Sequence, residues 1–142
     1  MRISRVIKWG LLLALVGIQF IEVERTNPPV TKELLASAEV KKILKDACYD
    51  CHSNETKWPW YSKVAPVSFL ITNHVNDGRR HLNFSTWGNL FTPKQKEYKK
   101  EIWEEIERGN MPISHYTWLH PKAKLTPEQL QLIKSWSKGE KF

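Results

Sequence analysis

Residues 40–52 read VKKILKDACYDCH and join a helical pattern to two closely spaced cysteines and a histidine. The apolar residues recur at intervals of three and four, which is the period of one face of an α-helix. Cys48 and Cys51 continue that apolar face, and Ser37 stands where the helix N-cap is expected. The pattern therefore predicts one amphipathic helix that begins after Ser37 and carries both cysteines on its buried side.

The five residues Cys48-Tyr49-Asp50-Cys51-His52 match the CxxCH pattern of covalent c-type haem attachment. Two thiols three positions apart on a helical turn project side by side, so both can bond to the two vinyl groups of one haem. His52 follows directly and is expected to be the proximal ligand of the iron. The motif predicts a single, covalently bound haem c as the cofactor.

Three other uses of these residues are weighed against haem attachment. A structural zinc site needs a fourth ligand and usually a second pair of closely spaced ligands, which the sequence lacks. A thioredoxin-type redox pair is expected after a strand in a βαβ context, which is not visible either. A plain disulfide between Cys48 and Cys51 would leave His52 without a role.

Met111 is the candidate for the other face of the iron. It is the only methionine besides the initiator and follows a helical segment that ends near Gly109. A thioether ligand favours ferrous iron and raises the reduction potential relative to a second histidine. The competing ligands are the other histidines, His74, His81, His115 and His120. His120 lies in the same loop as Met111. If none of them binds, an open iron site would suit gas sensing or peroxidase-like chemistry.

The N-terminal segment differs from the rest of the chain. Three basic residues precede an apolar run over residues 9–18, which is the arrangement of an export signal or a retained transmembrane helix. We expect residues 1–26 to be a membrane anchor or signal segment and residues 27–142 to be the haem domain. A retained anchor would hold the protein in a bacterial inner membrane, with the haem domain facing the periplasm.

Composition limits the class of protein and its partners. Subtracting 15 acidic from 22 basic residues among 142 gives a net charge of +7, and 41% of the residues are hydrophobic. The length suits one globular domain. A basic surface would favour acidic redox proteins, a respiratory assembly or anionic lipid. No nucleic-acid-binding motif is present, so nucleic acid is not expected as a partner.

The remaining segments also read as helices and loops. Thr92 and Gly109 bound one predicted helix, and a capping box of Thr126 and Gln129 opens a C-terminal helix that stops before Gly139. Residues 57–91 are expected to form loop plus one short helix. The predicted fold class is all-α: a small cytochrome c-like domain with long loops, behind an N-terminal transmembrane or signal helix.

Two groups of side chains receive further expectations. Arg79 and Arg80 are expected in a solvated basic turn around Gly78, where one of them would pair with a haem propionate. Large aromatic rings cover a porphyrin well, so six tryptophans are expected to wrap the haem. Tyr116 and Trp118 are expected to form the wall on the distal side of the haem. The six tryptophans are Trp58, Trp60, Trp87, Trp103, Trp118 and Trp136.

Motifs spread along the chain resemble those of the bacterial haem-binding domain family related to cytochromes c. The similarity runs from about Asn27 to Trp136, and residues 48–61 are its most distinctive part. It rests on residues 47–56, 58–61, 65–66, 78–79, 83–85, 111–112, 116, 120–121 and 125–126. The resemblance implies a mostly helical single-haem domain, with Cys48, Cys51 and His52 attaching the haem and Met111 as sixth ligand.

Together these observations predict a membrane-tethered monohaem cytochrome c that carries single electrons and catalyses no substrate chemistry itself. The alternative is a haem-based sensor or peroxidase-like enzyme with an exchangeable sixth ligand. A zinc-stabilised interaction module is the third reading.

Overall fold

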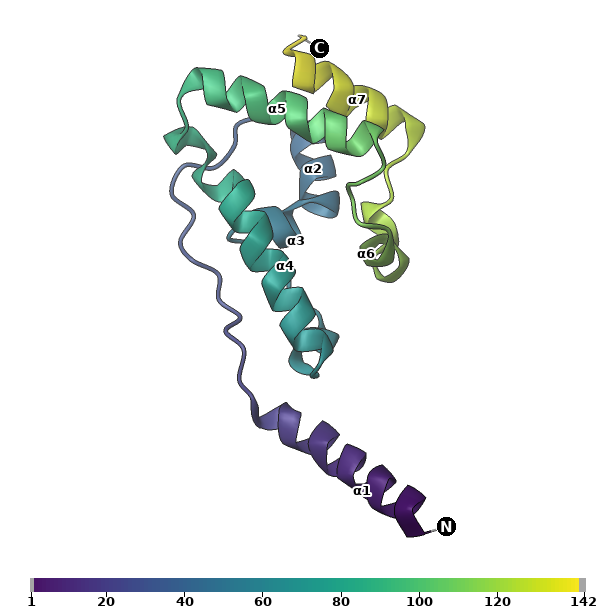
Figure 1. Ribbon diagram of the computed structural model, residues 1–142. Helices are drawn as coiled ribbons and strands as arrows, with labels where there is room; N and C mark the ends of the chain where they lie inside the picture. Colours follow the sequence, from purple (N-terminus) through teal and green to yellow (C-terminus); the bar gives the residue numbers. More distant parts are fainter. Residues whose placement is uncertain (1, 141–142) are drawn as a thin grey trace.

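The structure is a computed structural model that describes residues 2–140, and over these residues it is helical and contains no strand. Short 3-10 turns connect seven α-helices, and Figure 1 shows the helices α2 to α7 gathered together while α1 projects away from them. The α-helices are α1 (Arg2–Gly17), α2 (Ala38–Ala47), α3 (Tyr49–His52), α4 (Val67–His81), α5 (Thr92–Glu107), α6 (Ser114–Leu119) and α7 (Pro127–Lys138). The 3-10 turns are η1 (Ile18–Phe20), η2 (Trp60–Lys63), η3 (Phe84–Asn89) and η4 (Pro121–Ala123). The predicted all-α class is confirmed for the described part of the chain.

The hydrophobic core lies where α2, α5 and α7 meet. α5 runs along α7, and α2 packs beneath them (Figure 1). The predicted capping box is present: the Thr126 hydroxyl accepts from the Gln129 N–H, and the Gln129 side chain accepts from the Thr126 N–H. Gly139 ends α7 with a φ of 75°, which only glycine adopts easily. The buried residues of the core include Leu34, Val40, Leu44, Tyr49, Phe84, Trp87, Ile133 and Trp136.

The predicted helix over the CxxCH motif is divided in two. Ser37 caps α2 by accepting from the N–H of Val40, as expected, but α2 ends at Ala47. Cys48 has φ −126° and ψ −34°, outside the helical values, and α3 begins at Tyr49. The expectation that both cysteines share one continuous helix is therefore wrong. The Cys48 carbonyl restarts the helix, because it accepts from the N–H groups of Cys51 and His52 at 3.2 and 2.9 Å.

The expectation of loop plus one short helix over residues 57–91 is also wrong, because α4 is 15 residues long. Its buried residues are Ser68, Thr72 and Val75, which have helical spacing but are mostly small and polar. An apolar period cannot reveal a helix whose inner face is built from such residues. The six-residue helix α6 was not expected either, and it buries no residue fully.

The N-terminal helix exposes most of its apolar side chains. α1 ends at Gly17 after 16 residues, fewer than the ~20 that span a bilayer. No helix within residues 2–140 is long and apolar enough to cross a membrane, so the predicted transmembrane helix finds no support. The division into residues 1–26 and 27–142 stays a prediction.

Residues 22–36 follow α1 as an irregular strap that lies on the domain. The N–H of Leu34 donates to the carbonyl of Phe84 at 2.8 Å, and the Leu34 side chain is buried in the core. The Asn27 side-chain amide donates to the Thr56 carbonyl at 2.9 Å. These hydrogen bonds fix the strap to the folded domain.

The tryptophans do not form the predicted shell around a cofactor. Trp87 and Trp136 are buried in the core, and Trp103 packs partly buried against it. Trp60 and Trp118 are 77% and 81% exposed. None of the six lines the cavity described below or the two smaller cavities beside it. The many tryptophans of this chain therefore belong to the hydrophobic core or to an exposed surface.

Candidate functional site

A cavity of about 260 Å³ lies against the CxxCH motif. It is bounded by α3, by the inner face of α4 and by the chain between α5 and α6. Two smaller cavities adjoin it and share several of its wall residues. The predicted site residues Cys48, Cys51, His52 and Met111 all line the main cavity.

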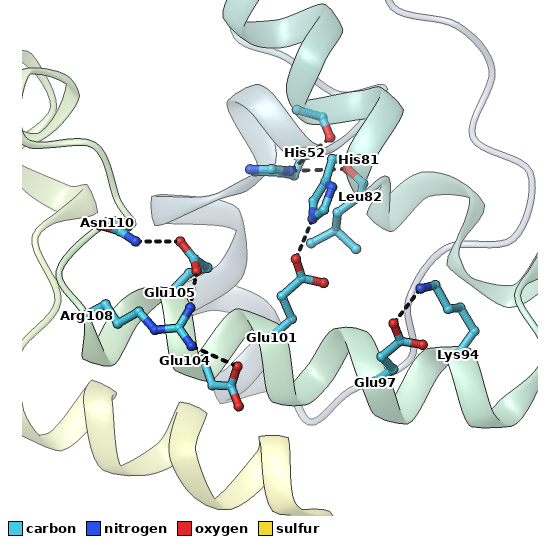
Figure 2. Close-up of polar contacts among 11 residues, drawn as sticks. His52, His81, Leu82, Lys94, Glu97, Glu101, Glu104, Glu105, Arg108 and Asn110 are labelled. Carbon is cyan, nitrogen blue, oxygen red and sulfur yellow. Dashed lines mark hydrogen bonds and ion pairs between the residues drawn. The ribbon is translucent and has the colours of Figure 1, made fainter.

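The His52 imidazole is held in one orientation by the end of α4. Its Nδ1 lies 3.1 Å from the carbonyl oxygen of Gly78 and 3.2 Å from that of Leu82 (Figure 2). Carbonyl oxygens only accept, so Nδ1 must carry the proton and donate to them. The neutral ring then keeps a lone pair on Nε2, the nitrogen that a metal would bind.

Burial supports the same protonation state. Removal from water lowers the pKa of His52, although the two carbonyl acceptors partly oppose this effect. The neutral form, which has a free lone pair, is therefore favoured over the imidazolium. The edge of the Phe84 ring also packs against His52, with the ring centroids 6.5 Å apart. A rigid, neutral imidazole is what a proximal ligand requires.

Gly78 allows α4 to approach the motif closely. A Cβ atom at this position would lie 2.5 Å from the carbonyl oxygen of Cys51 and 3.0 Å from its carbonyl carbon. The contact is with backbone, which cannot swing aside. The absence of a side chain is therefore a condition for the carbonyl of Gly78 to reach Nδ1 of His52.

Both thiols are free and half-buried, and they are not poised for thiolate chemistry. Removal from water raises the pKa of Cys48 to about 12 and that of Cys51 to about 11, and for Cys51 the charge of Asp50 adds to the shift while Arg79 opposes it. Redox-active cysteine pairs have lowered pKa values. The environment therefore argues against the thioredoxin-type alternative, since both thiols stay protonated at neutral pH.

Met111 is positioned by the end of α5. Gly109 has a φ of 74° and turns the chain, and the N–H groups of Asn110 and Met111 both donate to the carbonyl of Glu105. The Asn110 side chain also donates to the Glu105 carboxylate at 2.9 Å (Figure 2). This double attachment directs Met111 toward the main cavity, where its side chain remains 37% exposed.

The other histidines occupy three different environments. His74 and His81 line the main cavity, but Nε2 of His81 donates to Glu101 at 2.7 Å (Figure 2). His115 and His120 line a smaller neighbouring cavity instead. His120, the competitor that shares the Met111 loop, is bonded through Nε2 to the Tyr61 hydroxyl at 2.6 Å. His74 is thus the competitor with the clearest access to the main cavity.

Sequence reasoning missed a polar network centred on Asp50, one of the two variable residues of the motif. The Tyr116 hydroxyl donates to the Asp50 carboxylate at 2.8 Å, and the Tyr116 ring stacks on His120 with centroids 4.3 Å apart. The N–H of Lys57 donates to the other carboxylate oxygen at 3.0 Å. The network ties α6 to the motif. Its partners are 66 and 7 residues away, so no local pattern could indicate it.

Arg79 and Arg80 do not form the predicted basic turn. They lie in the last turn of α4, and the Arg79 guanidinium is already occupied. It donates to the carbonyls of Ser53 and Thr26 and to the side-chain oxygens of Asn27 and Thr56. Arg80 pairs with Asp77. Neither arginine lines the main cavity or its two neighbours, so the expected pairing with a propionate is not supported.

A metal-only centre receives no support from the geometry. Over residues 2–140, no three histidine, cysteine, aspartate or glutamate side chains are grouped so that they could hold a metal ion. The donors at the main cavity that suit a haem are the two thiols, the oriented His52 imidazole and the Met111 thioether, with the His74 imidazole as a further candidate ligand.

Comparison with known proteins identifies the family. The family model described as haem-binding domain matches residues 13–139, which is most of the chain. No curated protein and no solved structure matches it. The chain belongs to the haem-binding domain family.

Proposed function

We propose that the protein is a monohaem c-type cytochrome that carries single electrons outside the cytoplasm. The residues at the main cavity fit this cofactor. Cys48 and Cys51 would hold the haem through thioethers, and Nε2 of His52 and the sulfur of Met111 would bind its iron. A bound haem supplies reversible one-electron exchange between ferric and ferrous iron.

The observation that carries this proposal is the orientation of His52. Two α4 carbonyls hold its Nδ1 proton, and its ring lies in the wall of the cavity that both cysteines also line. Such hydrogen bonds fix the tautomer of a metal-binding histidine and make the other nitrogen a better ligand. A structural histidine would also need an acceptor for its buried N–H, but it would have no need to lie in a cavity wall with the other ring nitrogen unbonded in the described part of the chain.

The chain's own residues would also limit what the iron can do. The thioether of Met111 is a neutral, soft ligand that favours ferrous iron. Its attachment to the end of α5 would keep it beside the cavity. We therefore propose electron transfer without substrate chemistry, with acidic redox proteins or a respiratory assembly as partners for this basic chain. Residues 1–26 would direct the protein to a bacterial inner membrane, with the domain in the periplasm.

Replacement of Met111 tests the ligand set. Met111→Leu in protein from cells that mature c-type cytochromes is expected to abolish the methionine-to-iron absorption band of the ferric state and to lower the reduction potential. The matched control is His74→Leu, which alters another wall residue of the same cavity and should keep the band. An unchanged spectrum in Met111→Leu would instead favour the sensor or peroxidase-like alternative.

A further inference from the structure

One end of the domain carries large apolar side chains that no other part of the described chain covers. Trp60 in η2 and Trp118 in α6 are the most exposed of them. We call this surface the tip patch. It consists of Trp60, Val64, Val67, Leu70, Trp118 and Leu119, all of them exposed.

The segments that carry the tip patch are held together by contacts behind it. Trp60 packs edge-on against Tyr61, and the Tyr61 hydroxyl bonds to His120, which directly follows α6. Ile71 of α4 and Leu119 of α6 line the same small cavity. These contacts bring the start of α4 and the end of α6 together at one end of the domain. Isolated exposed apolar residues are ordinary, but a cluster with two tryptophans indicates an interaction site.

The N-terminal helix reaches the domain next to this patch. The side-chain amide of Gln19 donates to the carbonyl of Ala65 at 3.0 Å and accepts from the Ala65 N–H at 3.0 Å. Arg25 adds a bond to the carbonyl of Ser62. Figure 1 shows α1 leaving the domain beside the lower, N-terminal end of α4. The exposed apolar surface of α1 and the tip patch therefore adjoin.

The segments that carry the tip patch have lysines but no acidic residues, whereas the strap that contacts them through Arg25 also carries Glu22 and Glu24. Residues 56–76 and 111–127 contain the patch, four lysines and no aspartate or glutamate. The lysines are Lys57, Lys63, Lys122 and Lys124, and all are exposed. Tryptophans flanked by lysines are typical of protein surfaces that rest at the boundary between lipid headgroups and acyl chains.

We propose that the tip patch docks on an anionic lipid surface, with Trp60 and Trp118 inserted at headgroup depth and the four lysines near the phosphates. α1 exposes apolar side chains over nearly its whole length, so a bilayer that covers α1 also meets the patch. Docking at the patch would fix the domain relative to the membrane, which a tether alone would leave free to rotate. The proposal does not depend on the haem.

Quenching by brominated lipids tests the docking directly. The full chain with Trp9→Phe, which removes the α1 tryptophan, is bound to vesicles of brominated phosphatidylcholine with or without phosphatidylglycerol. The added substitutions Trp60→Phe and Trp118→Phe are expected to lower the quenched fraction of the emission by about twofold or more in the anionic vesicles. Both residues are exposed, so the fold should be kept.

The matched control is Trp103→Phe, which changes a tryptophan packed against the core and should not lower the quenched fraction. Lysines near anionic headgroups strengthen binding, so omission of phosphatidylglycerol should reduce quenching of the unaltered patch. Equal quenching with and without Trp60 and Trp118 would overturn the proposal. Equal quenching in neutral and anionic vesicles would overturn the proposed recognition of anionic lipid, and absence of quenching in both would make an acidic protein the better candidate for the patch.

Discussion

Because Gly78 has no side chain, α4 can contact the backbone of Cys51 at this position. Helix propensity alone predicts that Gly78→Ala stabilises α4 by about 1 kcal/mol. We expect the opposite, a loss of about 1–3 kcal/mol, because the added Cβ would lie 2.5 Å from the carbonyl oxygen of Cys51. Urea unfolding of the two proteins measures the difference in free energy.

Gly10→Ala is the matched control for that substitution. It also lies within a helix, but a Cβ there meets no atom within 4 Å. Its free energy of unfolding should stay equal to or above that of the unaltered protein. If Gly78→Ala is as stable as Gly10→Ala, the close packing of α4 against the motif is not what the glycine provides.

The site also depends on the hydroxyl group of Tyr116. Tyr116→Phe keeps the ring stacked on His120 but removes the bond to the Asp50 carboxylate. A hydrogen bond to a charged acceptor contributes about 1.5 kcal/mol or more, so we expect a loss of that size in the free energy of unfolding. Thermal or urea unfolding measures it.

Tyr98→Phe controls for the general effect of losing a phenol hydroxyl. Tyr98 is half-buried on α5, and no hydrogen bond of its hydroxyl is found within residues 2–140. Its loss should change the free energy of unfolding by less than about 0.5 kcal/mol. Equal effects of the two substitutions would show that the network around Asp50 contributes nothing specific.

At the scale of elements, Glu33 joins the strap to α2 and α3. Burial raises the pKa of Glu33, but the bond to Lys41, the charges of Lys41 and Lys45 and the Tyr49 hydroxyl outweigh that effect and lower it below 4.5. A lowered pKa means that the unfolded chain takes up the proton first as the pH falls. The stabilisation by Glu33 is therefore complete at neutral pH and is lost as the pH falls through the lowered value.

Glu33→Gln should thus lower the free energy of unfolding by about 1 kcal/mol at pH 7 and by progressively less in acid. Unfolding curves recorded from neutral pH to below the pKa of the carboxyl measure this change. Glu97→Gln, which removes an exposed partner of Lys94, should cost less than about 0.5 kcal/mol at any pH. A constant difference between Glu33→Gln and the unaltered protein at all pH values would contradict the account.

Helices with strong local signals were predictable from sequence, and the others were not. α5 and α7 each have an apolar period, a proline in the first turn and a glycine after the last turn, α7 adds a capping box, and the structure confirms both helices. The break at Cys48 and the length of α4 depend on contacts between distant segments. The carbonyl of Gly78 must reach His52, and Ser68 and Thr72 face inward where a periodic pattern calls for apolar residues. These features are determined by tertiary packing, so they could not be predicted from local propensity.

The candidate site also has a part that local sequence signals predict and a part that depends on contacts between distant segments. A motif of five adjacent residues identified Cys48, Cys51 and His52, and a lone methionine after a helix identified Met111. The structure places all four at one cavity. The network from Asp50 to Tyr116 and the occupation of Arg79 by the strap join segments far apart in the chain. Those contacts became visible only once the fold was known.

At the scale of the whole molecule, the apolar surface is divided between two tasks. Trp87, Trp136 and their neighbours form the core, whereas Trp60 and Trp118 project from one end beside α1. A domain of this size buries only part of its surface, so large side chains left outside need a reason. Under the two proposals, the cavity beside the CxxCH motif would hold the haem and the tip patch would face lipid.

The most direct test of the central claim is the mass of the intact polypeptide under denaturing conditions. Protein produced in cells that mature c-type cytochromes should carry the added mass of one haem after acid and organic solvent have unfolded it. Cys48→Ser with Cys51→Ser should give the mass of the polypeptide alone. If the unaltered protein releases its pigment and also shows only the polypeptide mass, the haem is not bonded to Cys48 and Cys51, and the proposed cytochrome c is contradicted.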